Sequence, residues 1–190
     1  MITKRAPTPR RAATQDRLVA AATAVVARRG FHAATVDEIA AEAGYSVGAL
    51  YSNFKGKDEL FLAVFEGHMR WFAERLQAAA GGPGKRVVHD WMEALADNPE
   101  QLLIFIEFWA YAVRKPRLRR RFAERMAEIR AATAKALEER ATAAGRPLGL
   151  PADTLALVLM AAGRGLGLEK LADPEAVDDS ATDLLSGLIP

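Results

Sequence analysis

The stretch from Thr35 to Phe54, TVDEIAAEAGYSVGALYSNF, constrains this chain more than any other part of it. Thr35 and Glu38 have the spacing of a capping box, which begins a helix by satisfying backbone N–H groups that have no partner within the helix. Gly44 can take the left-handed conformation that ends a helix, and Ser46 offers a second N-cap directly afterwards. The pattern therefore predicts two short helices joined by a tight turn, which is a helix-turn-helix.

The second of these helices has one packing side and one side of small residues. Val47, Leu50 and Tyr51 recur at the spacing of one helical face. The remaining positions carry only small, uncharged side chains: Gly48, Ala49, Ser52 and Asn53. A short helix of this kind can lie deep in the major groove of DNA, where base edges are distinguishable, so we expect it to be the reading helix.

Residues 14–64 resemble the N-terminal domain of the tetracycline-repressor (TetR) family of transcriptional regulators. The matching residues keep the register and spacing of the family: Gly30-Phe31, Thr35-Val36, Ile39-Ala40, Ala43-Gly44, Ser46, Gly48, Leu50-Tyr51, Phe54, Lys57 and Leu60. The match covers roughly the first third of the chain, and the remainder resembles the family only as a helical domain of suitable length. The resemblance implies a homodimer that binds a palindromic operator in double-stranded DNA and responds to a small-molecule effector.

The resemblance also implies which residues contact DNA. Tyr51 and Lys57 would contact phosphates, which set register, while the reading helix would face the bases, which set sequence preference. The candidate DNA-binding residues are Thr35, Ser46, Val47, Gly48, Ala49, Tyr51, Ser52, Asn53 and Lys57. The family often has a basic residue where Val47 stands and a threonine where Ala49 stands. Because this reading helix lacks a basic side chain, thymine-methyl contacts and groove shape are expected to weigh more.

Composition and charge narrow the class of protein. The chain has 190 residues, is 51% hydrophobic and contains no cysteine, which excludes disulfides and thiolate metal sites. It has no apolar signal segment at its N-terminus and no apolar run of the ~20 residues that span a bilayer, so we expect a soluble, cytoplasmic protein without membrane partners. Residues 1–29 carry seven bases and one acid, whereas residues 150–190 carry two bases and seven acids. The N-terminal end is therefore the one suited to a polyanion.

Hydrophobic periodicity predicts an all-α protein with about nine helices and no strand. Besides the two short helices, the predicted helices span residues 14–29, 58–80, 85–97, 100–114, 116–144, 152–171 and 175–189, and Gly81-Gly82-Pro83-Gly84 interrupts the chain after the fourth helix. We expect three parts: a flexible basic arm (1–13), a helix-turn-helix domain (14–56) and a helical ligand-binding and dimerisation domain (57–190). The arm either contacts phosphates or a minor groove, or remains a solvated tail.

An aromatic group in the larger domain is a candidate effector site. The residues assigned to it are His68, Phe72, His89, Trp91, Phe105, Trp109 and Met126. Apolar walls with a few polar groups are typical of ligand pockets, but the same aromatic residues can equally form a solid core. The helix of residues 100–114 is apolar on nearly every side, which predicts burial, with Glu107 on a hydrated stripe beside Leu103, Ala110 and Arg114.

The last two helices present more apolar surface than a small domain needs to hide. The residues predicted to pair across a two-fold axis, as a four-helix bundle, are Leu155, Val158, Leu159, Ala162, Leu166, Leu184, Leu185 and Leu188. The glycines from Gly163 to Gly167 have no preceding strand, so they predict close helix packing rather than a dinucleotide site. The basic run from Arg114 to Arg121 is expected to be a solvated face.

Three functions remain open at this point. The first is a TetR-type regulator, a repressor released from its operator by a mostly apolar small molecule. The second is a ligand-independent DNA-binding dimer, and the third is a helical small-molecule carrier that does not bind DNA. An enzyme is not expected, because His32, His68 and His89 stand alone and no nucleophile is paired with a base. We expect no metal and no cofactor.

Overall fold

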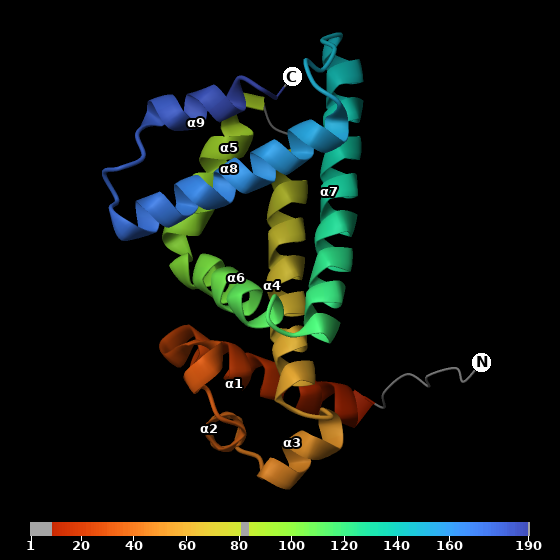
Figure 1. Cartoon of the computed structure of the whole chain (residues 1–190), viewed down its shortest axis with the longest axis vertical. Helices are drawn as coiled ribbons and strands as arrows, with labels where there is room; N and C mark the ends of the chain where they lie inside the picture. The colour runs from red at the N-terminus through yellow and green to blue at the C-terminus, as the bar shows by residue number, and fades with distance from the viewer. Residues whose placement is uncertain (1–8, 81–83, 190) are drawn as a thin grey trace, which may run out of the picture. The chain divides into compact units, whose positions relative to one another are not determined.

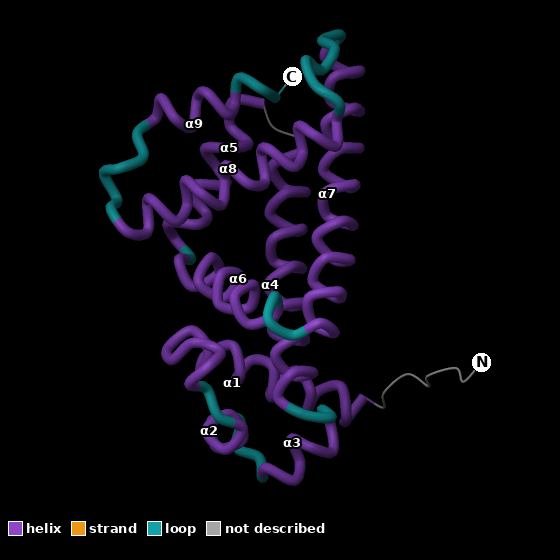
Figure 2. Tube along the Cα trace, viewed as in Figure 1, coloured by secondary structure: helices purple, strands orange, loops and turns teal. Residues whose placement is uncertain are grey.

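The computed structural model describes residues 9–80 and 84–189, and over these residues the chain forms nine α-helices and no strand (Figures 1 and 2). The helices are α1 (Pro9–Ala33), α2 (Val36–Glu42), α3 (Val47–Asn53), α4 (Lys57–Ala80), α5 (Gly84–Asp97), α6 (Pro99–Ala112), α7 (Pro116–Ala144), α8 (Ala152–Ala172) and α9 (Asp179–Ser186). The predicted all-α fold is confirmed.

The first and last helices differ from their predicted limits. Helix α1 begins at Pro9, so residues 9–13 of the predicted arm are helical, in keeping with the preference for proline at the first position of a helix. Helix α9 begins four residues later than predicted, because the Asp178 carboxylate accepts a hydrogen bond from the backbone N of Ala181 (3.2 Å) and caps the helix there. Residues 1–8 of the arm and residues 81–83 of the predicted breaker lie outside the described residues.

The helices pack into two compact units, which we describe separately. The head unit comprises the described residues up to His68 together with Leu103–Leu118, and the body unit comprises Met69–Leu102 and the residues from Arg119 onward. The compact head unit therefore extends beyond the boundary that was predicted after residue 56. The first half of α4 and most of α6 belong with the helix-turn-helix.

Aromatic packing explains why α4 and α6 join the head unit. The Phe31 ring at the end of α1 meets the Phe61 ring of α4 edge-on, with 4.6 Å between centroids. The Phe65 ring of α4 stacks on the Phe108 ring of α6 at 4.4 Å. All four rings are fully buried. Ring pairs of this kind contribute about 0.5–1.5 kcal/mol each beyond the area they bury, so the head core includes three long helices.

Helix α6 is buried on one side only, which corrects the prediction that it is buried all round. Phe105 and Phe108 are buried, but Leu103 and Trp109 are 40% and 48% exposed. Periodicity cannot distinguish these positions because every face of this helix is apolar.

The core of the body unit joins α5, α7, α8 and α9. Its buried residues are Val88, Met92, Ala134, Leu137, Leu155, Ala156, Val177, Leu185 and Ile189. Helix α8 approaches its neighbours through small residues: a side chain at Gly167 would place its Cβ 3.0 Å from Leu95 and 3.1 Å from Leu102. The predicted close helix packing is present at Gly167 and at Gly163, where a Cβ would lie 3.4 Å from Trp91, but not at Gly165, where a Cβ would meet no atom within 4 Å.

Candidate nucleic-acid interface and effector cavity

Local hydrogen bonds build the helix-turn-helix as the sequence predicts. The Thr35 hydroxyl accepts from the backbone N of Glu38 (3.2 Å), and the Glu38 carboxylate accepts from the backbone N of Thr35 (3.2 Å), which completes the capping box. The Ser46 hydroxyl accepts from the backbone N of Ala49 (3.2 Å) and begins α3. Gly44 takes φ 71° in the turn between the helices, a conformation that favours glycine.

Helix α1 braces the end of the reading helix α3 through two side chains that the sequence analysis did not single out. The Arg11 guanidinium donates to the Ser52 carbonyl (3.2 Å), and the Gln15 amide donates to the Asn53 carbonyl (3.3 Å). These carbonyls lie at the C-terminal end of α3, where a cation is favourable. Arg11 therefore stabilises α3 by hydrogen bonding and by its charge.

Basic side chains of α1 also surround the turn before α3. A hydrogen bond with Thr14, followed by one with Arg17, lowers the pKa of the Tyr45 phenol, and the charge of Arg10 acts in the same direction. Arg10, Arg11 and Arg17 are all exposed. The beginning of α1 thus places three cations around the reading helix, as a protein that binds a polyanion requires.

The structure leaves five of the nine candidate DNA-binding residues exposed: Thr35, Ser46, Gly48, Tyr51 and Ser52. Tyr51 is the most prominent of them at 53% exposure. Val47 and Ala49 are half-buried. Asn53 is also half-buried, and its amide donates to the Ala49 carbonyl (2.9 Å), so in this state its side chain is turned onto its own helix.

Lys57 also differs from the simple expectation of a lysine extended toward phosphate. Its ammonium donates to the His32 carbonyl (3.3 Å) and lies 5.0 Å from the centre of the Phe61 ring. Burial, followed by the nearby charge of Lys115, lowers the pKa of Lys57. Lys55, in the turn before α4, is the exposed base at this junction.

Glu107 of α6, which was predicted to lie on a hydrated stripe, instead contacts the end of α1. The Glu107 carboxylate accepts a hydrogen bond from the backbone N of Phe31 (3.1 Å). The preceding Gly30 has φ 73° and ψ 164°, which interrupts the helical conformation of α1. The freed backbone N–H is therefore satisfied by a residue 76 positions away in the sequence.

A second polar cluster ties the start of α4 to the end of α6. The Asp58 carboxylate accepts from the Tyr111 hydroxyl (2.5 Å) and from the Lys115 ammonium (2.6 Å). Burial acts to raise the pKa of Asp58, but the hydrogen bonds from Lys115 and Tyr111 outweigh it and leave the pKa below its usual value. Asp58 thus stays charged and anchors the first turn of α4 within the head unit.

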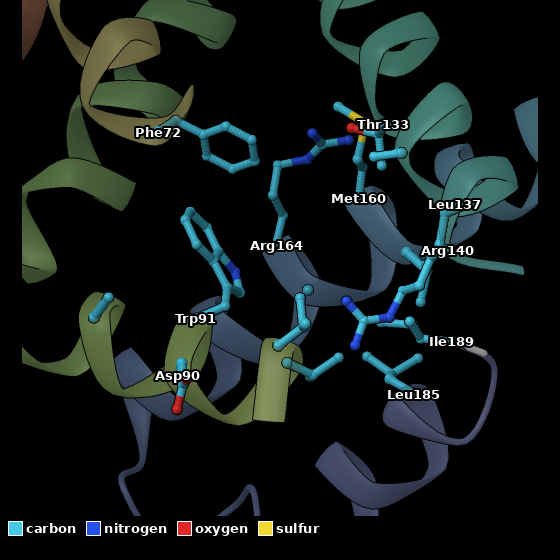
Figure 3. A pocket seen from close by; sticks show the side chains of 16 residues that line it. Phe72, Asp90, Trp91, Thr133, Leu137, Arg140, Met160, Arg164, Leu185 and Ile189 are labelled. Atoms are coloured by element: carbon cyan, nitrogen blue, oxygen red, sulfur yellow. The ribbon is translucent and has the colours of Figure 1, made fainter. Parts of the chain in front are cut away.

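The body unit contains a cavity of about 360 Å³, within the range of small-molecule sites (Figure 3). It is lined by Phe72, Val87, Val88, Asp90, Trp91, Ala94, Thr133, Ala136, Leu137, Arg140, Leu159, Met160, Gly163, Arg164, Leu185 and Ile189. Phe72 and Trp91 form one wall, where their rings meet nearly edge-on at 4.6 Å. The walls are therefore mainly apolar and aromatic.

Two of the seven predicted effector residues, Phe72 and Trp91, line this cavity. The other five lie elsewhere. His68 and Phe105 pack against each other in the head unit, with ring centroids 6.0 Å apart. Trp109 is exposed on α6, His89 is exposed and faces Glu93 (3.3 Å), and Met126 is a half-buried residue of α7 outside the lining. The predicted aromatic residues thus divide among the head core, the cavity wall and the surface.

The apolar surface of α8 and α9 also divides differently from the prediction. Leu155 and Leu185 belong to the body core, and Leu159 and Leu185 line the cavity. Ala162 and Leu166 are half-buried, while Val158, Leu184 and Leu188 are exposed. The exposed large apolar residues of α8 and α9 are Leu157, Val158, Leu168, Leu171 and Leu184, and Leu188 just after α9 is also exposed. Three members of the predicted set, Val158, Leu184 and Leu188, are therefore among the exposed apolar residues of this region.

The part of the chain that the structure describes, residues 9–80 and 84–189, holds neither a cluster of metal-binding side chains nor a helix that could span a membrane. No three histidine, aspartate or glutamate side chains among those residues come together as a metal site. None of the helices described is long and apolar enough to cross a membrane.

Two family models match the chain and together cover both units. Residues 18–64 match bacterial regulatory proteins of the tetR family. Residues 84–189 match the C-terminal domain of the BetI-type transcriptional repressor. The first match contains the helix-turn-helix, and the second contains most of the cavity lining and the exposed face of α8 and α9.

Individual proteins show the same likeness. The HTH-type transcriptional repressor Rv1474c of Mycobacterium tuberculosis is 32% identical over 164 residues, 86% of this chain and 85% of that protein. The HTH-type transcriptional activator FasR of Mycolicibacterium smegmatis is 47% identical over 55 residues, 29% of this chain and 25% of that protein. Two other curated relatives are matched over 31% and 27% of their lengths. For FasR and these two proteins, the match therefore spans about a quarter to a third of the relative.

A solved structure of a transcriptional regulator from Rhodococcus sp. Rha1 has a similar fold. It is 27% identical, the match covers 92% of this chain and 95% of that chain, and the TM-score is 0.74. The likeness therefore extends over the head and the body.

Proposed function

The chain belongs to the TetR family of bacterial transcriptional regulators, and we propose that it is a repressor released from its operator by a largely apolar small molecule. The observation that carries the proposal is the cavity in the segment that matches a repressor's C-terminal domain. A ligand-independent DNA-binding dimer would need no such space. A carrier without DNA binding would need neither α3 nor its brace from α1.

The head unit supports the DNA-binding part of this proposal. Helix α3 exposes Gly48, Tyr51 and Ser52, and its position is fixed by the Ser46 cap at one end and by Arg11 at the other. In the proposed complex α3 lies in the major groove, and Tyr51 with the cations of α1 contacts phosphates. Lys57 would reach phosphate only after leaving the His32 carbonyl, so we propose that exposed Lys55 contributes as well.

The proposed release requires the effector to bind one state of the protein better than the other, because a ligand shifts an equilibrium only by its differential affinity. Helix α4 carries Phe72 of the cavity and also Lys57 and Asp58 of the head unit. We propose that a change of α4 on effector binding alters the spacing of the two reading helices. DNA-bound dimers need that spacing to match one turn of the double helix, ~34–36 Å.

The test uses the DNA directly upstream of the gene. Fluorescence anisotropy with a labelled upstream fragment should show binding that weakens steeply as salt rises, since phosphate contacts release counterions. A fragment of scrambled sequence is the control and should bind far more weakly at the same salt. Equal affinity for the two fragments would contradict sequence-specific regulation, and no binding to either would favour the carrier.

The dimer provides a second prediction. We propose that the exposed apolar residues of α8 and α9 pair with those of a second copy, because Leu184 is 72% exposed and no globular core covers it. Leu184→Arg should give monomers in light scattering at micromolar concentration, with an unchanged helical circular dichroism spectrum. It should also lose most of its operator affinity, because one half-site cannot replace two.

The neighbouring residue gives a matched control. Leu185 is only 8% exposed and belongs to the body core, so Leu185→Arg should lower the melting temperature of the body unit. A Leu184→Arg protein that remains dimeric would contradict the proposed interface.

A further inference from the structure

Trp91 brings a hydrogen-bond donor to the cavity wall. Its side chain is half-buried and lines the cavity, so the indole ring is within reach of a molecule bound there. Over the described residues it makes ring contacts with Phe72 and Trp71, at 4.6 and 6.1 Å between centroids. No group in that part of the chain accepts a hydrogen bond from its indole N–H. A ligand that covers this nitrogen must therefore supply an acceptor, or it leaves a donor unsatisfied.

The other side-chain donors of the lining already have partners. Arg140 and Arg164 both have interactions within the described chain. The Thr133 hydroxyl donates to the Ile129 carbonyl (2.9 Å). The indole N–H of Trp91 is therefore the donor of the described lining whose pairing depends on a ligand.

The acid of the lining is also engaged. The Asp90 carboxylate lies 3.6 Å from the guanidinium of Arg86, a neighbour on α5 that does not line the cavity. In Figure 3 the Asp90 side chain lies at the edge of the site. A ligand hydroxyl beside Trp91 would bring a donor of its own that needs an acceptor, whereas a carbonyl oxygen only accepts. The site therefore suits a carbonyl better than a hydroxyl.

Gly163 of α8 leaves space beside this donor. A Cβ at Gly163 would lie 3.4 Å from Nε1 of Trp91 and 3.7 Å from Cδ1. These are ordinary contact distances, so the approach of α5 and α8 leaves room for a methyl group here. At Gly167, in contrast, a Cβ would lie 3.0 Å from Leu95. In Figure 3 the nitrogen of the Trp91 ring is on the side that faces Arg164 of the same helix α8. The absent side chain of Gly163 thus keeps the space next to the indole N–H open.

We propose that the cavity binds an uncharged, largely apolar carbonyl compound, whose oxygen accepts a hydrogen bond from the Trp91 indole N–H in the space that Gly163 leaves. The apolar part of the molecule packs against Phe72 and Leu137 of the lining. The proposal rests on the proposed function, in which the cavity is the effector site. It adds to the apolar character of the effector one polar group and the residue that recognises it.

Nuclear magnetic resonance of isotope-labelled tryptophan in the full chain without DNA tests the contact directly. The probes are hexanophenone and its analogue in which a methylidene group replaces the carbonyl oxygen, so the two share one shape. Hexanophenone should move the indole proton of Trp91 downfield, and the analogue should not, because it has no acceptor. The signal is assigned by its loss in Trp91→Phe, and exposed Trp109 is the internal control. Hexanophenone that fails to bind, or that binds without this shift, would overturn the proposal.

Affinities of variants locate the acceptor within the cavity. Calorimetry measures the ratio of hexanophenone affinity to analogue affinity, which cancels changes in shape that act on both. Trp91→Phe removes the donor, and Gly163→Ala places a methyl group beside it. Each should lower the ratio roughly three- to tenfold, as the loss of one hydrogen bond predicts. A ratio that stays at the wild-type value in both variants would overturn the proposed contact.

Gly165 of the same helix gives a matched control. It is exposed, and a Cβ there would meet no atom within 4 Å, so Gly165→Ala should leave the ratio unchanged. Alanine is more favourable than glycine inside a helix, so both alanine variants should fold, which circular dichroism melting checks. The resonance shift in the wild-type protein tests the proposal whatever the stability of a variant.

A last measurement separates this inference from the proposed function. Both probes are added to the complex with upstream DNA. Hexanophenone that shifts the Trp91 signal but leaves the complex intact would support the carbonyl contact and contradict release by the effector. An analogue that binds and releases DNA as readily as hexanophenone would overturn the carbonyl contact and support release.

Discussion

Ala49→Glu is expected to abolish operator binding while leaving the fold intact. Ala49 lies half-buried on α3, one position before the buried Leu50 that packs this helix onto the head unit. In the proposed complex a glutamate here would carry its charge into a groove lined by phosphates. Like charges brought together at an interface cost several kcal/mol, and about 3 kcal/mol corresponds to a loss of roughly a hundredfold in affinity. Fluorescence anisotropy on the upstream fragment measures this loss.

Two controls separate charge from shape and from folding. Ala49→Gln has nearly the size of the glutamate without its charge, so it should retain more affinity than Ala49→Glu at every salt concentration. Circular dichroism melting should give similar temperatures for both variants, because glutamate and glutamine have similar helix propensities. Operator affinity that survives Ala49→Glu would mean that α3 is not the reading helix.

The helix-turn-helix could be predicted from the sequence because local rules determine it. The Thr35 and Glu38 capping box and the Ser46 cap each join residues three positions apart, and all three hydrogen bonds are present. The two short helices begin where these caps predict. Capping and periodicity act within one or two turns, so a single sequence is enough to show them.

The contacts that hold this element in place could not be predicted in the same way. Arg11 reaches Ser52 across 41 positions, and Glu107 reaches Phe31 across 76 positions. Nothing in the local pattern of α6 distinguishes Glu107 from a solvated acid, because the interaction depends on an unpaired backbone N–H in another helix. The cavity has the same origin, because its lining residues come from α4, α5, α7, α8 and the end of the chain and share one site only through the packing of these elements.

Periodicity also cannot decide which apolar face of a helix meets its own core. In α9, Leu184 and Leu185 are adjacent leucines, and the apolar pattern of the sequence predicts both at a dimer interface. The structure buries Leu185 among α5, α7 and α8 and leaves Leu184 exposed. A helix with apolar residues on two sides satisfies the rule for amphipathic helices in more than one orientation, and tertiary packing decides between them.

Gly30→Ala should destabilise the head unit more than any other small substitution at a glycine. At φ 73° and ψ 164° the backbone is in a region populated almost only by glycine, and a side chain there costs about 1–3 kcal/mol. The new Cβ would also lie 2.8 Å from a carboxylate oxygen of Glu107. That carboxylate would have to leave the backbone N of Phe31, with the loss of a charge-assisted hydrogen bond of about 1.5–3 kcal/mol. A total near 3–4 kcal/mol is a large part of a typical folding free energy.

Urea unfolding monitored by circular dichroism measures this effect, and Gly44 offers a matched control. Gly44 has φ 71°, but a Cβ there would meet no atom within 4 Å, so Gly44→Ala should show only the backbone cost. Glu107→Ala in the Gly30→Ala background should add less destabilisation than it does in wild type, because the hydrogen bond is already broken. A Gly30→Ala protein no less stable than Gly44→Ala would show that the Glu107 contact contributes nothing. Because Glu107 lies on α6, full coupling between the two substitutions would establish that α6 fixes the conformation at the end of α1, and with it the helix that braces α3.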